Sequence, residues 1–360
     1  MPGSAQPSFS IPDDDALIAR ALEDASIPTL MMSMIHMSGD TGLLDGVIRP
    51  TGVFINEYQG YMSEENKAVV RAQALEVIKT FRDGDCQLPS PPSNETIHRM
   101  MNFIVAGEVP EDYVPMMLEE MELDGTDQRS DAWGDEVSVD KRAQHKVLVI
   151  GGGMSGVLAA YRLQEARIPF VVIEKNASVG GTWYENRYPG ARVDVGNHLY
   201  SYSFQPAHHW SQYFSQQKEL HEYFQGVVYT HQLQQHFRFQ TEVTGAVFDE
   251  ETSLWMIDTV DKDGVTEQYE VNSVISAVGQ LNRPILPDIP GIESFKGKWC
   301  HSAAWDESID CSGKRVVVVG SGASAFQLVP SIAGQVEHLT VFQRSAPWMF
   351  ENPIYHEDVP

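Results

Sequence analysis

Three glycines, Gly151, Gly153 and Gly156, stand in the spacing G-x-G-x-x-G directly after a short run of branched apolar residues. In this arrangement the first glycine permits a tight turn, the second lets the backbone approach a pyrophosphate, and the third allows a helix to pack closely on a strand. The N-terminus of that helix offers free N–H groups and a positive dipole to phosphates. Glu174 lies 23 residues after Gly151, where a carboxylate accepts hydrogen bonds from a ribose 2′-OH and repels a 2′-phosphate. The pattern therefore predicts a site for FAD or NAD.

A second motif of this kind, with alanine at its last position, begins at Gly320 and includes Gly322 and Ala325. Arg344 lies 24 residues after Gly320, at the position that the acid takes in the first motif. A guanidinium can bind a 2′-phosphate through two hydrogen bonds, whereas an acid would repel it. Arg344 and the adjacent Ser345 therefore predict NADPH at the second site.

The cysteines limit which electron acceptor a protein with these two cofactors can use. Enzymes that combine FAD with NADPH include disulfide reductases, which need two redox cysteines near the first motif. The three cysteines of this chain, Cys86, Cys300 and Cys311, do not lie there and show no C-x-x-C spacing. A reduced flavin is therefore expected to pass its electrons to O₂ or to a diffusible acceptor. The same spacing argues against a disulfide framework or a zinc site, and no metal site is expected.

Two strand–helix–strand units are expected to position these motifs. Residues 146–150 and 169–175 are predicted as strands that flank the first helix. Residues 314–320 and 338–344 are predicted to do the same around the second helix. Three further segments between the units are expected to form a meander and return to the sheet, namely residues 237–249, 254–260 and 269–279.

The first 140 residues follow a helical pattern instead. Ser63 opens the longest periodic stretch, which ends near Gly84. The many methionines in this region recur at helical spacing, and we interpret them as core or interface packing and not as ligands. Shorter helices are expected after the acidic residues 13–15, up to Gly39, and at 94–107 and 110–123, followed by a polar linker over 124–142.

The charge of the chain limits its partners. The formal net charge is −25, and residues 1–140 alone hold 26 Asp and Glu residues against 8 Lys and Arg residues. Such acidity argues against nucleic acid or an anionic membrane as partner, because both are polyanions. No apolar run approaches the roughly 18–20 residues that span a bilayer, and the N-terminus lacks the features of a signal peptide. We expect a cytoplasmic protein, with the helical region as a candidate surface for a homodimer.

Two longer strings resemble the signatures of Baeyer–Villiger monooxygenases. Residues 179–194 (VGGTWYENRYPGARVD) are similar to the flavin-loop signature of that family, and residues 295–306 (FKGKWCHSAAWD) to its F-x-G-x-x-x-H-x-x-x-W-[P/D] fingerprint. The region around residues 13–40 resembles the N-terminal extension of the 4-hydroxyacetophenone monooxygenase type. The matching motif positions are Gly181, Trp183, Tyr188, Pro189, Gly190 and Asp194 in the first string and Phe295, Gly297, His301, Trp305 and Asp306 in the second.

The resemblance implies an FAD- and NADPH-dependent monooxygenase. In such enzymes NADPH reduces FAD, O₂ adds to give a C4a-peroxyflavin, and one oxygen is inserted next to a ketone carbonyl to form an ester or lactone. The N- or S-oxygenating flavin monooxygenases share both nucleotide motifs and are the alternative, which Trp305 and Asp306 disfavour. A third possibility is a truncated, inactive nucleotide-binding protein that associates through its helical region.

The resemblance also assigns roles to individual residues. Asp194 matches the carboxylate that pairs with the family's activating arginine, and His301 is expected to couple the position of the second domain to the state of the flavin. The expected FAD contacts are Gly151, Gly153, Ser155, Gly156, Glu174, Thr182, Trp183, Asp194, Tyr200 and the backbone of Val243. The expected NADPH contacts are Arg192, Val193, Asp194, Gly320, Ser321, Gly322, Ala323, Ser324, Ala325, Gln327, Arg344 and Ser345.

The implied fold is α/β, a flavoprotein with two dinucleotide-binding, Rossmann-like domains and an N-terminal α-helical extension. The extension and linker are expected over residues 1–140, the first half of the FAD domain over 141–294, and the fingerprint linker with the start of the NADP domain over 295–360. Chains of the family continue past the position that matches Pro360, and the activating arginine lies in that later part. The chain by itself is therefore expected to turn over ketones inefficiently.

Overall fold

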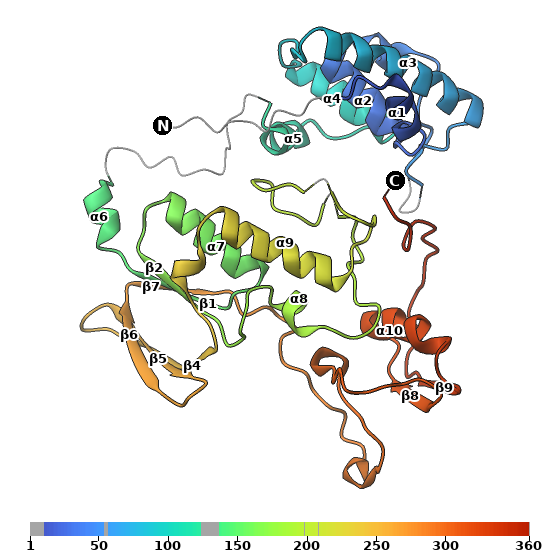
Figure 1. Ribbon diagram of the computed structural model, residues 1–360. Coiled ribbons are helices and arrows are strands. Elements are labelled where there is room, and N and C mark those ends of the chain that lie inside the picture. The colour runs from blue at the N-terminus through green and yellow to red at the C-terminus, as the bar shows by residue number, and fades with distance from the viewer. Residues whose placement is uncertain (1–10, 54–56, 124–136, 198, 208, 360) are drawn as a thin grey trace. The chain divides into compact units, whose positions relative to one another are not determined.

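A computed structural model describes residues 11–53, 57–123, 137–197, 199–207 and 209–359 (Figure 1). Contacts divide the chain into two compact units, one within residues 1–128 and one within 129–359. Each unit has its own hydrophobic core, so we describe each by itself.

The first unit is helical, as its sequence pattern predicts. Side-chain oxygens of Asp14, Ser63 and Ser93 accept hydrogen bonds from backbone N–H groups at the starts of three of its helices, which satisfies donors that have no partner within the helix. The unit contains α1 (Asp15–Ala21), α2 (Ile27–Ser38), the 3₁₀ turn η1 (Thr41–Asp45), α3 (Glu64–Asp83), α4 (Asn94–Ile104) and α5 (Tyr113–Met121).

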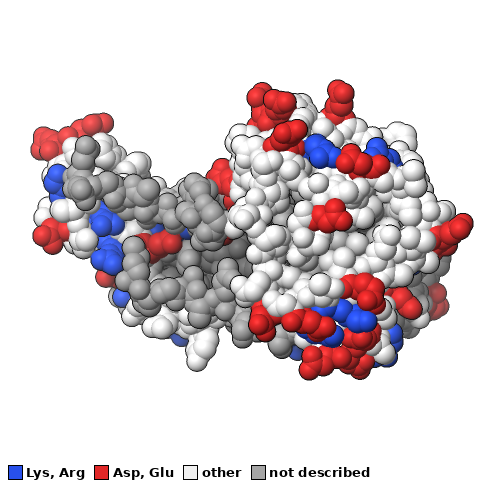
Figure 2. Space-filling view, turned by 90° about the horizontal axis from the view of Figure 1, so that it is seen from above, with Lys and Arg blue, Asp and Glu red and all other residues white. Residues whose placement is uncertain are grey.

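Methionines contribute much of the core of this helical unit. Met31 and Met34 on α2 and Met100 on α4 are buried, and they pack with apolar residues of α1, α3 and η1. For these three methionines the interpretation as core packing is confirmed, whereas Met116 is 49% exposed. Acidic side chains lie at the surface, and Figure 2 shows Asp and Glu spread over the visible face among fewer Lys and Arg.

The second unit is built on a parallel sheet with the strand order β3-β2-β1-β7. Strand β1 lies in the middle, and the C-terminal ends of β1 and β2 lead into the first glycine motif and into Glu174. The strands are β1 (Val147–Ile150), β2 (Phe170–Ile173), β3 (Phe237–Arg238) and β7 (Ser273–Ser276).

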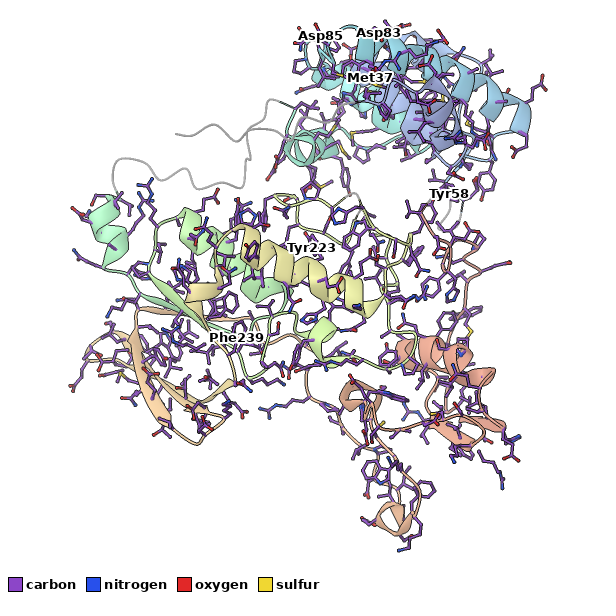
Figure 3. All side chains as sticks on the ribbon, viewed as in Figure 1. Met37, Tyr58, Asp83, Asp85, Tyr223 and Phe239 are labelled. Carbon is purple, nitrogen blue, oxygen red and sulfur yellow. The ribbon has the colours of Figure 1, made fainter. Side chains whose placement is uncertain are left out.

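Both faces of this sheet are covered, as a parallel sheet requires. Val147, Val149 and Val172 face helices α7 (Met154–Glu165) and α9 (Gln217–Thr230), while Leu148 and Ile173 face the other side. Tyr223 (labelled in Figure 3) lies on α9, where its hydroxyl accepts a hydrogen bond from the Tyr202 N–H and donates one to the Gln205 carbonyl. The 3₁₀ turn η2 (Gln234–His236) leads from α9 to β3. The other face carries the antiparallel meander of β4 (Thr241–Asp249), β5 (Leu254–Asp261) and β6 (Thr266–Val271).

Three predictions about boundaries need correction. The segment 237–249 forms two strands, because β3 pairs with β2 as far as Arg238 while β4 pairs with β5 from Thr241 onward. The segment 269–279 is not one strand, because β6 pairs with β5 as far as Val271 while β7 pairs with β1 from Ser273 onward. Asn272 makes this change of sheet, and its side-chain carbonyl accepts a hydrogen bond of 2.8 Å from the Lys146 N–H. Part of the predicted linker is helical, since Ser138 caps α6 (Val139–Ala143), whereas residues 124–136 lie outside the described part of the chain.

The second glycine motif lies in a smaller strand–helix–strand unit, as predicted. Strands β8 (Arg315–Val319) and β9 (His338–Phe342) pair in parallel, and α10 (Ala323–Ala333) connects them. Leu328 and Ile332 of α10 pack against Tyr188 and Ala191, which lie in the loop after β2. The turns η3 (Ile292–Ser294) and η4 (Ser302–Ala304) lie in the connection from β7 to β8.

Candidate functional site

The first glycine motif adopts the tight turn that its sequence predicts. Gly151 has φ +104°, and a Cβ on it would lie 2.6 Å from the Ala277 carbonyl oxygen. A Cβ on Gly156 would overlap the Gly151 carbonyl oxygen, so the third glycine lets α7 approach the strand end. Gly153 is the N-cap of α7, and no side chain in the described part of the chain caps this helix, so its first backbone N–H groups are available for a phosphate.

Glu174 joins this turn at the end of β2. Its carboxylate is 4% exposed and accepts hydrogen bonds from the N–H groups of Gly152 (2.5 Å) and Asn176 (2.7 Å). Each carboxylate oxygen can accept more than one hydrogen bond, so capacity remains for ribose hydroxyls. The turn and the acid together form a cradle that a dinucleotide fits.

The residues from Val179 to Tyr200, called here the aromatic loop, lie beside this cradle. A Cβ on Gly153 would lie 3.5 Å from Gly181 Cα, so the loop starts in contact with the glycine motif. Trp183 lies on the short helix α8 (Thr182–Glu185), and its indole N–H donates to the Tyr200 hydroxyl at 3.0 Å. Two residues predicted to line FAD, Trp183 and Tyr200, are thus held together.

Asp194 lies in the same loop with an exposed carboxylate. Burial raises the pKa of Tyr188 and of Tyr200, and the negative charge of Asp194 acts in the same direction on both. The backbone behind it is fixed by Asn197, which is fully buried and whose side-chain carbonyl accepts from the Ser215 N–H at 2.8 Å. The carboxylate of Asp194 is therefore exposed to solvent, while the backbone that follows it is held by the buried hydrogen bond of Asn197.

Arg192, two residues earlier, is turned inward. Its side chain is 9% exposed, its Nη1 donates to the Tyr355 carbonyl at 2.9 Å, and its guanidinium lies 5.4 Å from the centre of the Tyr355 ring. Among the described residues, its Nε has no hydrogen-bond partner and no carboxylate forms a salt bridge with it. Burial lowers the pKa of Arg192. It is a buried cation stabilised by a carbonyl and a ring face.

The second glycine motif is more open than the first. Gly320 has φ +110°, and a Cβ added to Gly320 or to Gly322 would meet no other atom within 4 Å. Helix α10 also starts without a side-chain cap. The Ser321 hydroxyl contacts the Ser345 carbonyl at 3.4 Å, which places the start of α10 beside the end of β9. Arg344 lies there with an exposed side chain.

Gln327 on α10 connects the second motif to the aromatic loop. Its Oε1 accepts from the Tyr188 hydroxyl (2.9 Å) and the Arg192 N–H (3.3 Å). Its Nε2 donates to the Arg192 carbonyl (2.8 Å) and to the Tyr355 hydroxyl (2.7 Å). Gly190 makes this approach possible, because a Cβ there would lie 2.7 Å from the Gln327 carbonyl oxygen.

The fingerprint string lies at the edge of this arrangement. His301 Nδ1 accepts a hydrogen bond of 3.1 Å from the Ala303 N–H and so caps the turn η4. Trp305 packs against the cluster that contains Tyr188. A cavity of about 560 Å³ is lined by residues of both this string and the aromatic loop, and the Arg187–Glu307 ion pair of 3.4 Å lies at its edge.

The aromatic loop thus contacts the first glycine motif at Gly153 and helix α10 of the second motif at Gln327. Among the described residues the hydrogen bond of the His301 side chain is local, with the Ala303 N–H. Val243 lies on β4 with its side chain packed against the sheet, and the expected contact of its backbone with FAD stays a prediction. Sequence reasoning missed Tyr355 and the Asn197–Ser215 pair. They lie in segments without any recognisable motif, and one sequence offered no signal for them. No group of three His, Cys, Asp or Glu side chains in the described part of the chain could hold a metal ion. No helix there is long and apolar enough to cross a membrane.

Comparison with known proteins places this geometry among flavoproteins. The family model described as pyridine nucleotide-disulphide oxidoreductase matches residues 148–359. An uncharacterized monooxygenase (y4iD) of Sinorhizobium fredii is 36% identical over 344 residues, which cover 95% of this chain and 51% of that protein. A Baeyer–Villiger monooxygenase of Streptomyces coelicolor is 46% identical over 57% of this chain and 38% of its own length.

Among solved structures, that of OTEMO in complex with FAD and NADP is similar, with a TM-score of 0.53 and 36% identity over 57% of this chain and 39% of that one. The chain therefore spans about half of the length of the curated relatives that it matches, or less.

Proposed function

Because the chain belongs to the pyridine nucleotide-disulphide oxidoreductase family, we propose that it carries the two nucleotide sites of a Baeyer–Villiger monooxygenase. The reaction converts a ketone, O₂, NADPH and a proton into an ester or lactone, water and NADP⁺. The observation that carries the proposal is the convergence of both glycine motifs on the loop that holds Trp183, Arg192 and Asp194. The names of the relatives support the reaction class.

FAD is proposed for the first motif. The turn at Gly151 and Gly156 has no room for a Cβ, the start of α7 has free N–H groups, and Glu174 is a buried carboxylate beside them. These features fit a pyrophosphate and the hydroxyls of an unphosphorylated ribose. Bound FAD would supply the redox chemistry, because it accepts a hydride and transfers electrons to O₂. Trp183 and Tyr200 would border its ring system.

NADPH is proposed for the second motif. The open start of α10 would receive the pyrophosphate, and Arg344 would bind the 2′-phosphate. The exposed side chains of Arg344 and Ser345 leave this place accessible. Asp194, exposed near Tyr188 and Tyr200, would accept a hydrogen bond from a substrate or cofactor amide.

The protein's part in oxygen transfer is to orient the reactants and stabilise anionic species. Arg192 is the buried cation nearest to Asp194 in sequence, but its Nη1 already donates to the Tyr355 carbonyl. We therefore keep the expectation that the activating arginine is a different residue. An aryl ketone as substrate, and pairing of two copies through the helical unit, also remain predictions.

A product analysis tests the reaction class. The chain is supplied with FAD, NADPH, air and a panel of aryl and cyclic ketones, with a sulfide and an amine in parallel reactions. An ester or lactone that gains one oxygen atom from O₂ supports the proposal. A sulfoxide or N-oxide without any ester would assign the chain to the N- or S-oxygenating alternative. A purified chain that binds no FAD would support the non-enzymatic alternative.

A further inference from the structure

We propose that Gln327 and Tyr355 are positioning residues, which lock the helix of the second motif onto the aromatic loop without contacting the pyridine nucleotide themselves. The inference rests on the proposed nucleotide site at the second motif and specifies how that site is held. It differs from the expectation that the Gln327 side chain binds NADPH directly.

The first step is that Gln327 has no hydrogen-bonding capacity left. A side-chain amide has two N–H donors and a carbonyl oxygen that accepts two hydrogen bonds. Tyr188 and Arg192 occupy the oxygen, while Arg192 and Tyr355 occupy the nitrogen. The side chain is only 8% exposed. A hydrogen bond from Gln327 to a nucleotide would therefore have to break one of these buried bonds.

The second step is that these bonds fix the position of α10. The second motif forms the start of this helix, and Gln327 lies one turn further on, facing the aromatic loop. The backbone approach at Gly190 and the packing of Leu328 on Tyr188 and Ala191 hold the same contact. A shift of α10 against the loop would therefore move one nucleotide-binding helix start relative to the other.

The third step concerns the segment that brings in Tyr355. After β9 the chain, dark red in Figure 1, runs away from α10 to the segment around residues 211–213. The backbone bonds Tyr213 N–H to Glu357 carbonyl (3.2 Å) and Val359 N–H to Ser211 carbonyl (2.9 Å) attach it there. Tyr355 itself packs against the ring of Phe214, with 5.1 Å between ring centres.

Tyr355 therefore joins both sides of the contact. Its hydroxyl accepts from Gln327 on α10, and its carbonyl and ring face stabilise the buried guanidinium of Arg192. Replacement of Tyr355 by phenylalanine removes the first interaction and keeps the other two. This makes Tyr355→Phe a selective test of the lock, since the nucleotide is not expected to touch residue 355.

The test measures NADP⁺ and FAD affinity by calorimetry, together with hydrogen exchange of the Arg192 and Val193 amides, in wild type and Tyr355→Phe. We expect NADP⁺ to bind about five- to tenfold more weakly in the variant, the range for one lost buried hydrogen bond, and the two amides to exchange faster by a similar factor. FAD affinity should stay within about twofold. Tyr188→Phe, which removes another bond to Gln327, should act in the same direction. Tyr229→Phe is the matched control, because its side chain is 76% exposed on α9.

Three results would overturn the lock. Unchanged NADP⁺ affinity and exchange in Tyr355→Phe, combined with lost NADP⁺ binding in Gln327→Leu, would show that Gln327 contacts the nucleotide directly. Equal losses of FAD and NADP⁺ affinity would show general loosening of the unit. If wild type binds no NADP⁺ at all, the proposed nucleotide site fails. In that case the hydrogen exchange of the Arg192 and Val193 amides alone tests the positioning role. Equal exchange rates in wild type and Tyr355→Phe would refute that role.

Discussion

Replacing Gly190 by alanine probes the contact between the aromatic loop and α10 most sharply. Gly190 has φ +82°, which an L-residue adopts at a cost of about 1–2 kcal/mol. In addition, the new Cβ would overlap the Ser331 hydroxyl and lie 2.7 Å from the Gln327 carbonyl oxygen. Forcing a methyl group into such a packed contact typically costs about a further 1–3 kcal/mol.

A second glycine in the same unit separates these two costs. Gly264 lies in the turn between β5 and β6 with φ +80°, and a Cβ there would meet no atom within 4 Å. Gly264→Ala should therefore show only the backbone cost, about 1–2 kcal/mol. Removal of the Ser331 hydroxyl by Ser331→Ala should restore part of the stability that Gly190→Ala loses.

The assay is urea unfolding of the three variants and wild type, followed by tryptophan fluorescence and near-UV circular dichroism. We expect a greater loss of unfolding free energy for Gly190→Ala than for Gly264→Ala. Equal losses at the two glycines would refute the close approach of loop and helix, and with it the shared site of the two motifs.

Three further perturbations have defined outcomes. Glu174→Gln should weaken FAD binding at least about tenfold in a flavin fluorescence titration, because it removes the charge from a buried acceptor of the Gly152 N–H; unchanged affinity would contradict its role. Arg344→Ala should weaken NADPH binding about tenfold and leave NADH binding unchanged, whereas equal losses for both nucleotides would remove the 2′-phosphate assignment. The hydrogen bond from Arg82 lowers the pKa of Asp15 below the value near 3.8 that this carboxyl has in the unfolded chain. The ionised Asp15 therefore stabilises the fold above that pH, and this stabilisation is lost as the pH falls through the lower pKa of the folded state. Asp15→Asn should therefore lower the melting temperature at pH 7 and converge with wild type in strong acid, and a constant difference at all pH values would contradict this.

The elements around both motifs could be predicted because their signals are local. Glycine spacing after a branched apolar run forces a strand, a tight turn and a helix, and the structure has each of them at Gly151 and at Gly320. The meander was predictable for the same reason, from alternating residues bounded by turns. The break between β6 and β7 at Asn272 could not be predicted in this way. It depends on β6 pairing with β5 and β7 pairing with β1, and strand pairing is a property of the folded chain.

The site itself was predictable only in part. The roles of Trp183 and Asp194 came from motif resemblance, and the structure adds their supports, such as the Asn197–Ser215 pair. Tyr355 reaches the site from a segment far along the chain, 163 residues after Arg192. No periodicity or motif in a single sequence encodes such a contact, since it arises only when α10 packs on the aromatic loop.

We propose that FAD and NADPH bind in one unit with their reactive ends adjacent. Anaerobic mixing of the FAD-loaded chain with NADPH in a stopped-flow spectrometer tests it directly, because hydride transfer bleaches the visible absorption of the flavin. We predict rapid bleaching by NADPH, slower bleaching by NADH, and loss of this preference in Arg344→Ala. A chain that retains FAD but whose flavin is not reduced by NADPH would contradict this arrangement of the two nucleotides.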